Sequence, residues 1–299
     1  LESADIQALS TAQARALTTE QVAAFESADI AALTSGQFAA LTTAQLRAID
    51  SADIAAIDTA DLGALGSTQW RAFTTAQIDA LTTTQLTSLG SADLQALTSA
   101  QLRVLSTDDL NSLTTEQFAA FTTAQIGSLT TTQVQNLESA DIQALSTAQV
   151  RALTTDQIVA LDSADIGALT SGQFATLSTA QLRAIDSADI AAIDTADLGA
   201  LNSAQIRALS TAQIDALTTT QLTSLGSADL QALTSAQLRA LSTGDLNSLT
   251  TEQFVALTTS QIASLTTGQV QNLESADLQA LTTAQVRAPV SYTHLTLPT

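Results

Sequence analysis

Apolar residues recur at two fixed places of an eight-residue unit, here called an octad, which repeats thirty-six times from Leu1 to Ala288. Position 1 is always Leu, Ile or Phe, and position 6 is aliphatic or aromatic except at Ala14. Position 3 is always Ser or Thr, and position 5 is always Gln or Asp. A fixed period of this kind predicts stacked repeats, each of which buries its apolar side chains only against its neighbours.

Each octad carries the signals that start a helix, as the octad Leu41–Ala48 illustrates. Position 2, here Thr42, is drawn mostly from the residues preferred as helix N-caps. Gln45 follows three residues later and can accept a hydrogen bond from the backbone N–H of the cap, as in a capping box. Leu41 and Leu46 then have the spacing of a hydrophobic staple. Because these signals return in every octad, we expect a new short helix in each one.

Geometry excludes one long helix, because eight residues at about 100° each leave a residual rotation of about 80° per octad. A regular strand fails as well, because positions 1 and 6 would point to opposite faces. We therefore predict an all-α protein, an α-solenoid of about 36 short capped helices with three or four octads per coil. The burial needed to order each octad predicts that alanines at positions 4 and 8 are also buried. A β-solenoid with ladders of Thr and Ser is the alternative fold.

A second, longer period divides the chain into blocks of seventeen octads, residues 1–136 and 137–272, followed by a partial block, 273–288. The two full blocks differ at only 21 of 136 aligned positions. We expect residues 1–288 to form a single solenoid. Residues 290–299 resemble the translation of a sequencing adapter, so residues 289–299 are expected to be a non-native, disordered tail.

The net charge of −20 disfavours binding to nucleic acid. No apolar stretch approaches the ~18 residues of a membrane span. Residues 1–288 contain no Cys, His, Lys, Met or Tyr, and no glycine-rich phosphate loop. We therefore expect no enzyme activity and no cofactor. The nine basic residues all stand at position 7, where solvated side chains that offset nearby carboxylates are expected: Arg15, Arg47, Arg71, Arg103, Arg151, Arg183, Arg207, Arg239 and Arg287.

Pairs of aspartates at positions 2 and 5 are the candidate metal ligands, since clustered carboxylates suit Ca²⁺. The same residues are also explained as acidic caps of helix N-termini. These calcium candidates are Asp50, Asp53, Asp58, Asp61, Asp186, Asp189, Asp194 and Asp197.

Two further features have both a structural and a functional interpretation. Trp70 could stack on a carbohydrate, but it occupies position 6, where Ile206 stands one block later, which favours a core residue. Rows of Thr and Ser hydroxyls at positions 2 and 3 could order water on ice or contact a polysaccharide. Helix caps and turns account for hydroxyls at these positions equally well.

The repeated sequence Leu-Thr-Thr-Ala-Gln-Leu-x-Ala resembles octapeptide arrays of giant bacterial surface exoproteins, often described as haem-utilisation or adhesion proteins. The resemblance covers residues 1–288 and implies a secreted or cell-surface protein in which other, flanking domains perform adhesion. Haem ligation finds no support in residues 1–288, because the usual ligands are missing. We predict a structural spacer or stalk, and the alternative is a binding module for glycan, ice or calcium.

Overall fold

The computed structural model describes residues 3–287, and all regular secondary structure in this range is helical. It consists of thirty-four α-helices and two 3₁₀-helices, one per octad. The prediction of an all-α solenoid is confirmed, and the described residues contain no strand that a β-solenoid would need. The predicted tail, 289–299, lies outside the described residues.

The chain divides into two compact units, one ending at Leu153 and the other beginning at Thr154. The helices of the first unit are α1 (Ser3–Gln7), α2 (Thr11–Ala16), α3 (Thr19–Ala23), α4 (Ser27–Ala32), α5 (Ser35–Ala40), α6 (Thr43–Ala48), η1 (Ser51–Ala56), α7 (Thr59–Gly63), α8 (Ser67–Trp70), α9 (Thr75–Asp79), α10 (Thr83–Ser88), α11 (Ser91–Ala96), α12 (Ser99–Leu102), α13 (Thr107–Ser112), α14 (Thr115–Ala120), α15 (Thr123–Ile126), α16 (Thr131–Gln135), α17 (Ser139–Ala144) and α18 (Thr147–Ala152).

The helices of the second unit are α19 (Thr155–Ala160), α20 (Ser163–Ala168), α21 (Ser171–Thr176), α22 (Thr179–Ala184), η2 (Ser187–Ala192), α23 (Thr195–Gly199), α24 (Ser203–Ala208), α25 (Thr211–Asp215), α26 (Thr219–Ser224), α27 (Ser227–Ala232), α28 (Ser235–Ala240), α29 (Thr243–Ser248), α30 (Thr251–Ala256), α31 (Thr259–Ser264), α32 (Thr267–Gln271), α33 (Ser275–Ala280) and α34 (Thr283–Val286).

Helix α6 shows how one octad folds. The Thr42 hydroxyl accepts a hydrogen bond from the Gln45 N–H at 3.3 Å, and the Gln45 Oε1 accepts one from the Thr42 N–H at 2.7 Å. This is the predicted capping box. The helix ends at Ala48, and the C-cap residue Ile49 is extended, with a φ of −63° and a ψ of 132°. Positions 1 and 2 are therefore a two-residue extended turn, and no described residue needs a positive φ.

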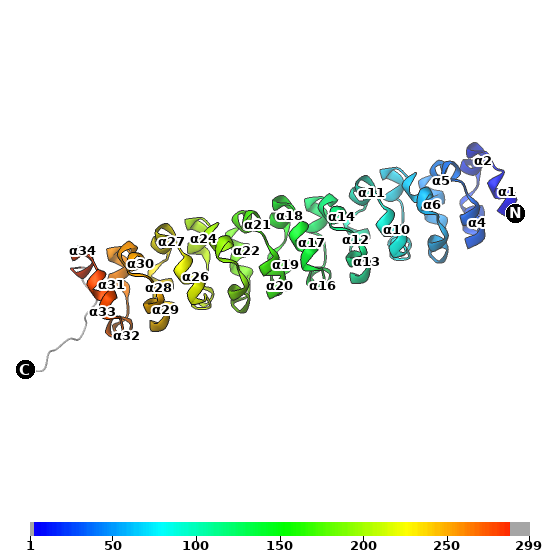
Figure 1. Cartoon of the computed structure of the whole chain (residues 1–299). Helices are drawn as coiled ribbons and strands as arrows, with labels where there is room; N and C mark the ends of the chain where they lie inside the picture. Colours follow the sequence, from blue (N-terminus) through cyan, green and yellow to red (C-terminus); the bar gives the residue numbers. More distant parts are fainter. Residues whose placement is uncertain (1–2, 288–299) are drawn as a thin grey trace, which may run out of the picture. The chain divides into compact units, whose positions relative to one another are not determined.

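Helices pack on the helices three octads away, not on their neighbours in the sequence. Within the first unit α2 packs on α5 and α10 packs on α13, and within the second α24 packs on α27 (Figure 1). Hydrogen bonds described below reach four octads away. A coil of the solenoid therefore takes between three and four octads, as predicted.

The core of each unit is made of the side chains at positions 1 and 6. Leu46 and Trp70, both at position 6, are fully buried. The prediction that Trp70 is a core residue is confirmed, and its ring contacts that of Phe73 at 5.5 Å between centroids.

The alanine prediction is only partly right. Ala72 at position 8 is buried, but alanines at position 4, such as Ala44 and Ala76, are exposed. The buried polar side chains of position 5, such as Gln45, fill the space between coils that the prediction assigned to position 4.

No helix among residues 3–287 is long and apolar enough to span a membrane. The prediction of one array over residues 1–288 stays a prediction, since the division after Leu153 matches neither that span nor the block boundary after residue 136.

Candidate functional site: the contacts between coils

The glutamine at position 5 binds two octads at once. Gln37 accepts a hydrogen bond from the cap N–H of its own helix, Thr34, at 2.7 Å. Its Nε2 donates to the carbonyl of Ile6, four octads earlier, at 2.9 Å and to that of Leu9, three octads earlier, at 2.6 Å. These carbonyls lie at the end of a helix, where the Ile6 carbonyl also accepts from the Leu9 N–H at 3.1 Å. We call this arrangement the glutamine clamp.

The clamp recurs along both units. Glutamines that are buried, or half-buried in the case of Gln69, donate in the same way to carbonyls 28 to 31 residues earlier. They are Gln37, Gln45, Gln69, Gln77, Gln85, Gln101, Gln117, Gln125, Gln133, Gln149, Gln205, Gln213, Gln221, Gln237, Gln253, Gln261, Gln269 and Gln285. Sequence reasoning found only the capping half of this role. The signal for the other half was that position 5 never accepts any residue except Gln or Asp.

An ionised aspartate at position 5 cannot complete the clamp, because a carboxylate has no hydrogen to donate. Some of these aspartates keep the capping half: Asp93 accepts from the Gly90 N–H at 3.1 Å, and its other oxygen accepts from the Trp70 indole at 3.0 Å. Others turn to a serine three octads earlier, as Asp61 does in accepting from the Ser35 hydroxyl at 2.7 Å. Glutamine at position 5 therefore donates a hydrogen bond to the previous coil, and an ionised aspartate at position 5 does not.

The eight calcium candidates fall into two groups. Those at position 2 cap their own helices, accepting from the N–H two residues later: Asp50, Asp58, Asp186 and Asp194. Those at position 5 accept from serine hydroxyls three octads earlier: Asp53, Asp61, Asp189 and Asp197. Within residues 3–287, no three acidic or histidine side chains gather in a group that could hold a metal ion.

Three buried aspartates at position 5 have raised pKa values. Burial, aided by repulsion from Glu138, raises the pKa of Asp141 to about 6. Burial also raises the pKa of Asp277, with repulsion from Glu274 acting in the same direction.

Burial raises the pKa of Asp61 too, and repulsion from Asp58 adds to this while the Ser35 hydrogen bond opposes it. The Oδ2 atoms of Asp61 and Asp277 are buried without a hydrogen-bond partner. A proton on such a carboxyl group removes the cost of burying a charge.

Arginines at position 7 make a second contact between coils, which the sequence did not indicate. The Arg47 Nε donates to the carbonyl of Ala72, three octads later, at 2.9 Å, and Arg183 and Arg207 do the same toward Ala208 and Ala232. These arginines are exposed, as expected, but Nε is bonded to a helix end and not to a carboxylate. At Gly127 the approach of the next coil is close, because an added Cβ would lie 2.9 Å from the Ala152 carbonyl oxygen, whereas at Gly63 nothing lies within 4 Å of an added Cβ.

The hydroxyl rows divide by position. Position 2 hydroxyls are used by the capping boxes, as at Thr42. The position 3 threonines of many octads, including Thr43 and Thr75, are exposed.

Comparison with protein families gives matches to the ALTTAQ repeat over residues 1–35, 54–91, 87–123, 107–138, 134–171, 190–227, 223–259 and 243–274. No curated protein matches the chain. Each family match spans at least 32 residues, which is the length of chain from Ile6 to Gln37 that one complete clamp requires. Because the matches cover more than half of its length, the chain belongs to the ALTTAQ repeat family.

Proposed function

We propose that this segment is a non-enzymatic spacer or stalk of a large bacterial cell-surface or secreted, adhesin-like protein. The glutamine clamp carries the proposal. The clamps join an octad to the helix end of the octad four places earlier, as Gln37 does with Ile6 and Gln85 with Ile54, so an added octad meets the interface that its predecessors met. Repeat number then sets length without any redesign of the contacts.

Comparison of the two seventeen-octad blocks supports a spacer, whose useful property is its length. All 21 differences between residues 1–136 and 137–272 leave position 5 unchanged, so each Gln or Asp recurs in the second block. Trp70, by contrast, is replaced by Ile206, and Phe73 by Leu209. The contacts between coils are retained while the bulk of core side chains varies.

The spacer role is tested by changing the number of blocks. Arrays of one, two and three seventeen-octad blocks, labelled with fluorophores at both ends, should show an end-to-end distance that increases by an equal step per block. A distance that levels off would contradict a spacer. Surface location is tested separately by labelling intact cells of a host that carries the full-length protein with an antibody against the repeat.

A binding module for glycan, ice or calcium is the competing function, favoured by the exposed threonines of position 3. A glycan array, a calcium titration and an ice-recrystallisation assay on the chain distinguish the two. Saturable binding at micromolar ligand would replace the spacer proposal by the binding one.

A further inference from the structure

The basic residues of this acidic protein are segregated from its acidic ones. All nine arginines stand at position 7, and the nine octads that hold them contain no Asp or Glu. The 29 acidic residues lie in the other octads. Although the net charge is −20, positive and negative side chains therefore stand in different octads.

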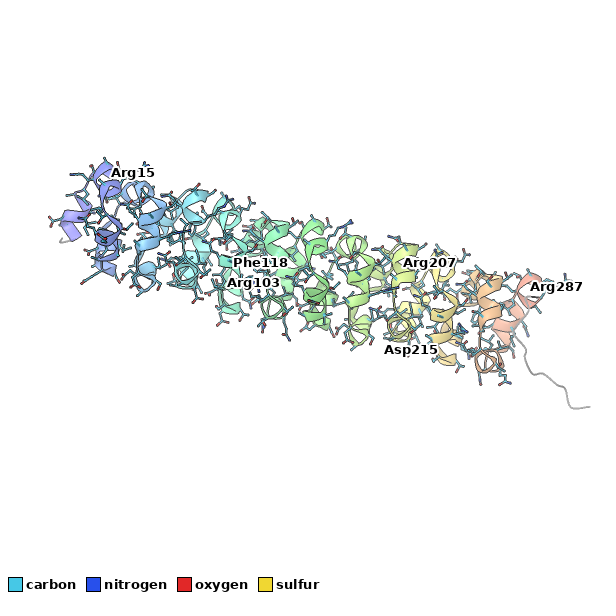
Figure 2. The ribbon with its side chains drawn as sticks, turned by 180° about the vertical axis from the view of Figure 1, so that it is seen from behind. Arg15, Arg103, Phe118, Arg207, Asp215 and Arg287 are labelled. Carbon is cyan, nitrogen blue, oxygen red and sulfur yellow. The ribbon has the colours of Figure 1, made fainter. Side chains whose placement is uncertain are left out.

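Four arginine octads of the first unit follow one another from coil to coil. The Gln45 clamp, in the octad of Arg47, ends on the backbone of Ala14 and Arg15. Helix α6 packs on α8, and the Gln101 clamp joins the octad of Arg103 to the end of α8. We call the four side chains the arginine ladder, and its two ends are labelled in Figure 2: Arg15, Arg47, Arg71 and Arg103.

The ladder presents exposed guanidinium groups, and that of Arg47 is held by a hydrogen bond to the next coil. All four side chains are exposed, and the Nε bond from Arg47 to the Ala72 carbonyl holds its guanidinium across two coils. Because Nε donates this hydrogen bond, the two terminal nitrogens of the guanidinium remain available to bind a carboxylate. An open groove between the two middle rungs is lined by Thr43, Ala44, Arg47, Thr68, Arg71 and Ala72.

Exposed carboxylates form a separate column in the same unit. Glu26 and Asp50 are the N-cap residues of α4 and η1, which lie three octads apart and pack on each other. The second unit repeats the arrangement with Asp162 and Asp186, the N-cap residues of α20 and η2, which also pack on each other. We call these two sets the acidic columns.

We propose that the arginine ladder binds an acidic column of a second copy of this chain, side by side. The step of three octads from Glu26 to Asp50, or from Asp162 to Asp186, equals the step from Arg47 to Arg71, so the two copies have matching charge spacing there. A uniformly charged polyanion such as nucleic acid would instead meet repulsion from the rest of the surface. Exposed ion pairs are individually weak, so several rungs must act together.

Sedimentation velocity of the full chain between about 0.05 and 0.5 M salt tests the proposal. The wild-type chain should self-associate at low salt and dissociate at high salt. Arg47→Gln with Arg71→Gln should weaken association by roughly tenfold or more, while Arg47→Lys with Arg71→Lys should retain most of it. Thr84→Glu with Thr220→Glu, an equal charge change at exposed sites outside the ladder, should not weaken it.

Circular dichroism verifies that each variant is folded. A wild-type chain that stays monomeric at every salt concentration would overturn the proposal. Association that the glutamine variants leave unchanged would do the same. Binding of a sulfated polysaccharide to a monomeric chain would assign the ladder to another partner and would also contradict it.

Discussion

The position 5 glutamine matters because its two ends satisfy backbone groups that no other side chain reaches. In Gln85 the Oε1 accepts from the Thr82 N–H, and Nε2 donates to the Ile54 and Ile57 carbonyls at 2.8 Å each. Both acceptor carbonyls lie at the end of a helix of the previous coil. Loss of the amide removes the donor of the Ile57 carbonyl, while the Ile54 carbonyl still accepts from the Ile57 N–H at 3.1 Å.

Replacing Gln85 by Met keeps the volume and removes the hydrogen bonds. We expect the free energy of unfolding to fall by about 1–3 kcal/mol, since buried polar groups lose their partners. Gln21 is the matched control because it is exposed and caps its own helix, so Gln21→Met should cost about 1 kcal/mol or less. Urea unfolding followed by circular dichroism measures both. Equal losses would mean that the contact between coils adds nothing.

Asp141 should make folding sensitive to pH. Its folded pKa of about 6 lies above the ordinary value of 3.8, so the folded state holds the proton more tightly than the unfolded state. Its contribution to stability is therefore largest at low pH and decreases as pH rises from about 4 to about 6. We expect Asp141→Asn to be more stable than wild type at pH ~7 and to lose this part of the pH dependence.

The test for Asp141 is the difference in unfolding free energy between wild type and variant across pH. Asp93→Asn serves as the control for removing one negative charge, since that carboxylate accepts from the Gly90 N–H and the Trp70 indole. A wild-type to Asp141→Asn difference that is constant with pH would contradict the assignment.

At the scale of the helix, stability depends on packing, because helices of four to six residues are too short to be stable alone. Leu102 at position 6 of α12 is fully buried. We expect Leu102→Ala to cost about 2–5 kcal/mol through lost burial and a cavity. Val159, 62% exposed on α19, provides the control, and Val159→Ala should change stability by less than about 0.5 kcal/mol. Thermal unfolding of both variants measures the contrast.

The local structure of each helix was predictable, because cap, capping box and apolar spacing all act within eight residues. The capping box of Thr42 and Gln45 is an example. The partner of the Gln45 amide was not predictable in the same way. It lies about thirty residues away, and only the number of octads per coil determines which carbonyl it meets. The alanines of position 4 were predicted to be buried but are exposed. This prediction was wrong for the same reason.

At the scale of the whole molecule, the aspartates of position 5 could be assigned as caps from their spacing alone. Their hydrogen bonds with serines three octads earlier, such as that from Ser35 to Asp61, could not be predicted. These contacts also depend on the number of octads per coil. The hydrogen bonds from arginines to helix ends could not be predicted for the same reason. The interpretation of the aspartates as calcium ligands stays a prediction.

The central claim is that octads are ordered by neighbours three and four places away. Far-UV circular dichroism of arrays of three, five, nine and seventeen octads tests it directly. Three octads contain no complete clamp, so they should show almost no helix, and helix content per octad should rise steeply with array length. Helix content per octad that is already the same in the three-octad chain as in the seventeen-octad chain would contradict the account.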